Sequence, residues 1–168
     1  IEDLIVFVSP PQIGQIQRIL AEKGILANRF TEKEGTIPEI RYSGRSERQF
    51  LIDKFKEQKI KALLAIKCLD EGIDIPSAKT AIILASSTNP REYIQRIGRV
   101  IRQAPGKAFS RIYDVIVKPN SEHLPDELRI FEIKVFEKEI IKSLDIAENA
   151  LNNAEASQQI FSILHEEG

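Results

Sequence analysis

The sequence has no methionine or tryptophan, one cysteine and two histidines in 168 residues. Cys68 alone cannot form an internal disulfide or a cysteine-based zinc site, which fits a reducing cytoplasm. His123 and His165 are far apart in sequence, which argues against a histidine metal cluster. Because no initiator methionine is present, we expect either a piece of a longer protein or a chain from which a leader or tag was removed.

The charge balance also excludes some classes of protein. The formal net charge is −1, so no global basic field marks the chain as a nucleic-acid binder, and any such surface must be local. No apolar run approaches the roughly 20 residues of a membrane span, and no signal peptide is evident. With 42% hydrophobic and 29% charged residues, the composition is typical of one globular domain with a single core.

Short apolar runs alternate with segments of helical period along the first two thirds of the chain. Such runs are typical of strands buried on both faces, and they predict strands at residues 4–9, 25–30, 60–67, 80–86 and 108–117. The intervening helices are predicted at residues 10–24, 46–58 and 90–103, with Ser46 as an N-cap. This alternation predicts an α/β fold with a mainly parallel central sheet and helices on both faces.

The amino-acid composition changes after Pro119, where nearly all residues favour helix. Apolar residues recur every three to four positions, which predicts helices at residues 126–143 and 146–165. We therefore expect two parts: a sheet domain over residues 1–118 and a helical extension over residues 119–168. The extension is expected to pack on the sheet domain or on a neighbour outside this chain.

The segment AIKCLDEGIDIP, residues 65–76, follows a predicted buried strand. Its loop should lie at the carboxyl end of the sheet, where open α/β folds place ligands. Asp70, Glu71 and Asp74 bring three carboxylates into five residues. They could bind a hydroxyl group, an arginine or a metal, or they could be ordinary acidic caps; a metal is the weaker reading because three carboxylates on one loop rarely converge.

The segment YIQRIGRVIRQ, residues 93–103, places Gln95, Arg99 and Arg102 on one side of a predicted helix. Ile97 and other apolar residues form the side that faces the sheet. Arginine suits a phosphate because its planar fork donates two parallel hydrogen bonds. Taken alone, the segment is more typical of a solvated charged helix face than of a phosphate site.

Together, EGIDIP and QRIGRVIRQ resemble motifs V and VI of superfamily 2 helicases and translocases, and the resemblance extends over roughly residues 4–117. Such enzymes have two tandem RecA-like domains, and these motifs belong to the second. The residues of the motifs are more similar to those of the type III restriction subunit and XPB-like branch than to those of DEAD-box RNA helicases. The latter usually have histidine in place of Gln95. The resemblance thus implies a three-layer RecA-like fold and favours double-stranded DNA.

The same resemblance implies specific roles around a nucleotide. Arg99 and Arg102 look like the arginine fingers that reach the γ-phosphate of ATP bound to the first domain, an interaction worth about 10³–10⁵ in rate. Four further residues would bind or shape the nucleotide site: Glu71, Gly72, Asp74 and Gln95. The resemblance further implies ATP and Mg²⁺ in the parent protein, held mainly by the first domain.

Nucleic acid is expected across the other part of the domain face. The resemblance implies contacts to phosphates at Ser9 and Lys67, and weaker candidates at Gly44 and Arg45. Many relatives have serine or threonine at the start of motif V, where this chain has Ala65 and Ile66. A hydroxyl contact is therefore not expected there.

The chain contains no G-x-x-x-x-G-K-[ST] segment, and no Asp-Glu pair that ends a strand ahead of a catalytic turn. A complete motor needs both, so this chain alone is not expected to hydrolyse ATP. The alternatives are a non-catalytic helicase-like module that docks protein or nucleic acid, and an unrelated α/β domain that binds a phosphorylated metabolite. The last needs a glycine-rich phosphate loop, which the proline-rich SPPQIGQ does not provide.

Overall fold

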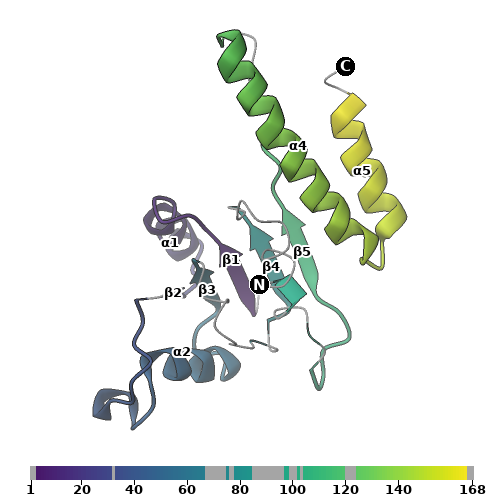
Figure 1. The fold of residues 1–168 in the computed structure, drawn as a ribbon. Coiled ribbons are helices and arrows are strands. Elements are labelled where there is room, and N and C mark those ends of the chain that lie inside the picture. The colour runs from purple at the N-terminus through teal and green to yellow at the C-terminus, as the bar shows by residue number, and fades with distance from the viewer. Residues whose placement is uncertain are drawn as a thin grey trace.

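The computed structural model describes residues 3–31, 33–66, 75, 78–84, 97–98, 102, 104–119 and 124–165. Its centre is a five-stranded sheet in the order β2-β3-β1-β4-β5, in which every pairing is parallel (Figure 1). The strands are β1 (Leu4–Phe7), β2 (Ala27–Phe30), β3 (Ala62–Ala65), β4 (Thr80–Ile83) and β5 (Arg111–Asp114). The parallel sheet predicted from the sequence is confirmed.

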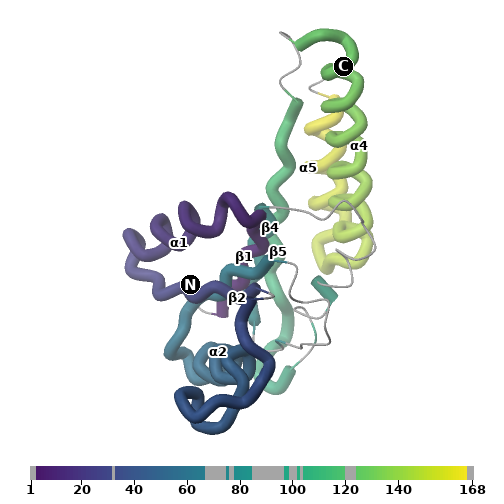
Figure 2. The backbone as a smooth tube through the Cα atoms, turned by 60° about the vertical axis from the view of Figure 1, so that its left-hand side comes forward, coloured from purple at the N-terminus to yellow at the C-terminus, as the bar shows by residue number. Residues whose placement is uncertain are grey.

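Helices cover both faces of this sheet. Helix α1 (Ile13–Glu22) joins β1 to β2, and α2 (Glu47–Lys56) joins β2 to β3 after the short 3₁₀ turn η1 (Ile40–Tyr42). The predicted cap of α2 is present, because Gln49 donates its backbone N–H to Ser46 Oγ at 3.2 Å. Helices α1 and α2 lie on opposite sides of the strands (Figure 2).

The alternation of side chains along β1 explains the two cores. Leu4 and Val6 pack in a cluster with residues of α1, whereas Ile5 and Phe7 pack in a second cluster with residues of α2. Successive residues of a strand point to opposite faces, so a strand that is covered on both sides must be apolar throughout. This requirement is why the LIVF and ALLA segments could be recognised as strands.

The register of the strand pairing brings the carboxyl ends of the strands to one level. Phe7 of β1 lies opposite Ala65 of β3 and Ile83 of β4, while Ile83 lies opposite Asp114 of β5. The loops that follow these strands therefore leave the sheet along one edge.

The extension consists of α4 (Asp126–Glu148) and α5 (Asn153–His165), which form a hairpin beyond the β5 edge (Figure 1). The predicted break after Ser143 is wrong, because α4 continues for five more residues. No glycine or proline interrupts residues 143–148, whereas Asn149 and Asn153 can bind backbone carbonyls at the end of the helix. Asn149 Nδ2 donates to Asp145 O at 3.1 Å, and Asn153 Nδ2 donates to Glu148 O at 3.2 Å.

Polar and apolar contacts join this hairpin to the sheet. Ser143 Oγ donates to Asp114 Oδ2 at 2.5 Å, and Lys142 Nζ lies 3.7 Å from Asp114 Oδ1. Lys142, only 2% exposed, also pairs with Glu139, and Ile146 packs against the core beneath α2. Within the described residues, no helix is long and apolar enough to span a bilayer.

The core beneath α2 provides a first prediction. Phe55 is fully buried on α2, so Phe55→Ala should lower the free energy of unfolding by about 3–5 kcal/mol. Ile40 is 97% exposed, and Ile40→Ala should change it by less than about 0.5 kcal/mol. Urea unfolding of the two variants checks this, and equal losses would contradict the core assignment.

Candidate nucleotide and nucleic-acid interface

The predicted site residues divide into two groups. Four lie within the described part of the chain: Ser9, Gly44, Arg45 and Arg102. Six others lie outside the described residues: Lys67, Glu71, Gly72, Asp74, Gln95 and Arg99. Cys68 and Asp70 lie outside them as well. The geometry of the interface is therefore built from the first group and its neighbours.

Ser9 lies at the point where the chain connections change from one face of the sheet to the other. The connection after β1 contributes Ile13 to the core on the α1 face. The connections after the neighbouring strands β3 and β4 contribute Ile75 and Ile97 to the opposite face. Such a change opens a crevice at the carboxyl ends of the strands, which is where open α/β sheets bind ligands.

The residues around Ser9 form a tight entry into α1. Gln12 Oε1 accepts hydrogen bonds from Ser9 N at 3.0 Å and from Ser9 Oγ at 2.8 Å. The first turn of a helix leaves backbone N–H groups without intrahelical partners, and these groups attract anions. Gly14 lies in this turn, and apart from its own helix backbone and chain neighbours no atom comes within 4 Å of the position a Cβ would take. A phosphate could thus approach the backbone closely here.

Gly44 lies at the tip of the loop between β2 and α2. Its φ of 76° is one that glycine adopts without strain, and the preceding Ser43 has a φ of 59°. The N–H of Gly44 donates to Glu39 O at 3.0 Å, and Glu39 N donates to Arg45 O at 2.9 Å. Since the Gly44 amide is already used within the turn, it would have to exchange this bond to bind a phosphate.

Glu47 fixes this loop against the start of α2. Its Oε2 accepts a hydrogen bond from Gly35 N at 3.2 Å. A hydrogen bond from Tyr42, followed by the one from Gly35, lowers the pKa of the Glu47 carboxyl, and the same contact raises the pKa of Tyr42. The ionised carboxylate therefore stabilises the folded loop.

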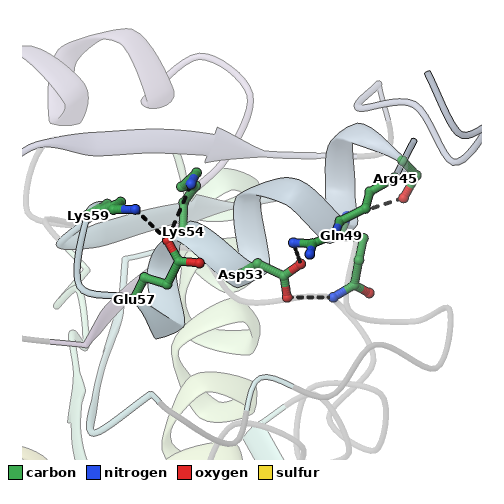
Figure 3. A network of polar contacts seen from close by, with 7 residues as sticks. Arg45, Gln49, Asp53, Lys54, Glu57 and Lys59 are labelled. Atoms are coloured by element: carbon green, nitrogen blue, oxygen red, sulfur yellow. Dashed lines mark hydrogen bonds and ion pairs between the residues drawn. The ribbon is translucent and has the colours of Figure 1, made fainter. Parts of the chain in front are cut away.

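Arg45 is held by the surface of α2 (Figure 3). Its Nη1 lies 2.6 Å from Asp53 Oδ2, and Gln49 Nε2 donates to Asp53 Oδ1 at 2.9 Å. About half of the Arg45 side chain remains exposed. Exposed pairs of this kind contribute little to stability, so the interaction orients the guanidinium more than it holds the fold together.

A second ionic group lies further along the same helix in Figure 3. Glu57 Oε2 lies 2.8 Å from Lys59 Nζ and 3.3 Å from Lys54 Nζ. The hydrogen bond from Lys59 is the main cause that lowers the pKa of Glu57. Glu57 thus offsets part of the positive charge of the two lysines at the end of α2.

Arg102 is not helical, so the helix predicted for residues 90–103 does not include it. Ile97 and Gly98 are helical, and Ile97 is buried against the sheet as predicted. Lys107 Nζ donates to Arg102 O at 3.1 Å, while the Arg102 residue as a whole is exposed. The backbone of Arg102 is thus attached to a buried residue, and its side chain is at the surface.

Lys107 is an unusual residue for this position because it is buried. Burial lowers the pKa of its amine, and the Asp3 carboxylate nearby partly opposes that shift. Asp3 precedes β1, and its Oδ2 lies 3.0 Å from Lys79 Nζ in an ion pair. Arg102 is therefore tied to a residue near the amino ends of the strands, whereas Ser9 follows the carboxyl end of β1.

Lys107 was not among the site residues predicted from the sequence. The signal that could have found it is the Pro105-Gly106 pair, which marks a tight turn and would bring the following residue back toward Arg102. Gln12 and Gly14 were not among the predicted site residues either. Among the residues that the structure describes, no group of three or more histidine, cysteine or acidic side chains is arranged to hold a metal.

The pattern of the helicase conserved C-terminal domain matches residues 5–104, more than half of the chain. The chain belongs to this family. The match includes β1 to β4 and extends through the arginine segment to Ala104. It confirms the predicted resemblance to the second RecA-like domain of superfamily 2 helicases.

Two similar curated proteins point in the same direction. The DNA 3'-5' translocase XPB2 of Sulfurisphaera tokodaii is 27% identical over 126 residues, which cover 68% of this chain and 28% of that protein. The putative helicase 22 of the Sulfolobus islandicus filamentous virus is 28% identical over 138 residues, covering 82% and 21%. This chain thus spans less than a third of the length of these relatives. The predicted likeness to XPB proteins is confirmed.

Solved structures support the fold. The C-terminal part of the Fun30 ATPase domain superposes with a TM-score of 0.59 at 20% identity, covering 82% of this chain and 48% of that one. A DEAD box protein from the hyperthermophile Methanococcus jannaschii gives 0.53 at 20% identity, covering 80% and 32%. The chain therefore has the predicted three-layer RecA-like architecture.

Glu47 provides a prediction on acid stability. Its folded pKa is lowered, so its stabilising effect is present above the unfolded pKa of about 4.5 and is lost as pH falls through the folded pKa. Acidification should therefore destabilise the unmodified chain more than Glu47→Gln, by a fraction of a kcal/mol. Thermal unfolding between about pH 7 and pH 3 measures this difference.

The control for this experiment is Glu22→Gln, at the exposed end of α1. That variant should keep the acid response of the unmodified chain. Parallel stability curves for Glu47→Gln and the unmodified chain would contradict the role assigned to Glu47.

Proposed function

We propose that this chain is the second motor domain of an ATP-dependent helicase or translocase that acts on double-stranded DNA. The observation that carries the proposal is the family match over residues 5–104, which includes the arginine segment. The similarity to a DNA translocase over 68% of the chain supports DNA as the substrate. ATP would be bound mainly by a first motor domain that is not part of this chain.

In this proposal, Arg99 and Arg102 stabilise the charge that develops on the γ-phosphate during hydrolysis. The exposure of Arg102 supports this role, because a finger must reach a nucleotide on another domain. Glu71, Gly72, Asp74 and Gln95 would shape the same side of the nucleotide. Mg²⁺ would be held with the phosphates by the first domain.

Nucleic acid would bind along the edge marked by Ser9 and the first turn of α1, with Lys67, Gly44 and Arg45 as further contacts. The open space at Gly14 and the unused amides of a helix start support phosphate binding there. RNA is the competing substrate: the probable ATP-dependent RNA helicase ddx49 of Dictyostelium discoideum is 32% identical over 57% of this chain.

A docking module without catalytic function is the second candidate. It is favoured by apolar side chains that are exposed at helical spacing on the first half of α4, at Leu128, Phe131 and Val135. Within a larger protein such a stripe would normally be covered.

The arginine assignment predicts a loss of turnover without loss of binding. In the full protein, Arg99→Ala or Arg102→Ala should lower the kcat for ATP by about 10³-fold, while ATP affinity changes much less. Arg41→Ala is the control, since Arg41 is exposed and paired with Glu39 on the η1 turn. Steady-state ATPase assays and nucleotide titration measure the two quantities.

The same assays distinguish the candidate functions when duplex DNA or single-stranded RNA is added. Stimulation by DNA, lost in the arginine variants, is the expected result. Stimulation by RNA alone would keep the mechanism and change the substrate. A full protein that hydrolyses no ATP under any condition would favour the docking module.

The Arg45–Asp53 pair allows a test in which two substitutions should change the affinity for DNA in opposite directions. If Arg45 contacts a phosphate, Arg45→Ala should weaken DNA binding and reduce the slope of log K against log salt by about 1. Asp53→Asn should instead strengthen binding, because it removes the carboxylate that holds the guanidinium. Fluorescence anisotropy at several salt concentrations measures both, and an unchanged slope in Arg45→Ala would assign Arg45 to the surface network alone.

A further inference from the structure

The segment that follows Arg102 forms a closed turn. Ala104, Pro105, Gly106 and Lys107 make a type II turn, with proline and glycine at the two central positions. Lys107 N donates to Ala104 O at 2.9 Å, and the φ of Gly106 is 77°. The backbone therefore reverses directly after the arginine segment.

The side chain of Lys107 closes this turn a second time. Its amine reaches back over the turn and donates to Arg102 O at 3.1 Å. Lys107 is only 9% exposed, although lysine is among the residues that proteins bury least. A charged donor on a carbonyl is a strong hydrogen bond, so the carbonyl of Arg102 is held by a side chain that is itself buried in the domain.

We propose that Lys107 is a positioning residue for Arg102: it anchors the Arg102 backbone so that the exposed guanidinium is directed at the partner domain. This inference rests on the proposed function, because it requires that Arg102 acts on a nucleotide. Lys107 itself does not contact the nucleotide in this proposal.

The physical reason is that the stabilisation of a transition state is lost when the stabilising group is slightly misplaced. A guanidinium at the end of a long side chain is placed correctly only if its backbone is fixed, and a displacement of about 1 Å can cost about 100-fold in rate. The family resemblance assigns the arginines but gives no account of what fixes them. The turn and the buried amine provide such a fixed point at the end of the segment.

Two variants test the anchor independently in the full protein. Lys107→Met keeps most of the apolar stem and removes the donor, and we expect kcat for ATP to fall about 10- to 100-fold with ATP affinity nearly unchanged. Gly106→Ala leaves Lys107 in place but strains the turn, because alanine disfavours the positive φ of this position. The strain comes from the backbone alone, since the new Cβ would meet no neighbouring atom. This variant should lower kcat in the same direction. Lys56→Met, at the exposed end of α2, is the control and should leave kcat unchanged.

A double-mutant cycle separates positioning from general stability. The background is Arg102→Lys, which keeps a charge but loses the planar fork, so that turnover remains measurable. If Lys107 acts through Arg102, adding Lys107→Met to this background should lower kcat by less than about threefold. Lys107→Arg keeps a charged donor, so it should retain part of the activity that Lys107→Met loses.

The outcomes separate this inference from the proposed function. Loss of kcat in Lys107→Met that disappears in the Arg102→Lys background supports the anchor. An undiminished loss in that background, or no loss at all, overturns the anchor while Arg102 keeps its role. If Arg102→Ala leaves turnover unchanged, the proposed function fails and the anchor fails with it.

Discussion

The parallel pairing of β1 with both of its neighbours is the constraint on which the rest of the domain depends. A parallel sheet needs a crossover after each strand, and every crossover covers one face. Because Phe7 is level with Ala65 and Ile83, the loops after β1, β3 and β4 all leave from one edge. The segment that resembles motif V begins at Ala65 on this edge, so its start lies level with the end of β1 because of the topology of the sheet.

The buried polar groups lie where this sheet meets other parts of the chain. Asp3 and Lys107 are buried beside the amino ends of the strands, and Lys142 is buried between Asp114 and Glu139 at the hairpin. Buried ion pairs add little net stability, but breaking one is costly because the remaining charge has no partner. Such contacts favour one arrangement of the hairpin over others. The Asp114–Ser143 bond fixes the point at which α4 meets the sheet.

The strands and the cap of α2 could be predicted because their signals are local. A continuous apolar run such as ALLA has few alternatives, and Ser46 bonds to a residue only three positions away. The end of α4 was missed because asparagine ends a helix less distinctly than glycine or proline. The contact between Lys107 and Arg102 depends on how a turn folds back, and that between Asp114 and Ser143 joins residues 29 apart in sequence. Neither pairing has a periodic signature.

The motifs and the anchor have different physical requirements, which explains why one was visible in the sequence and the other was not. A residue proposed to act on a phosphate must be arginine for its geometry, so its type and spacing carry information. A residue that fixes a backbone carbonyl needs only a donor of the right reach, and many residue types provide one. In a site shared by two domains, each domain must orient its own groups before they meet, because binding energy used for ordering is lost to catalysis. A buried lysine at the end of an arginine segment meets that requirement within this chain alone.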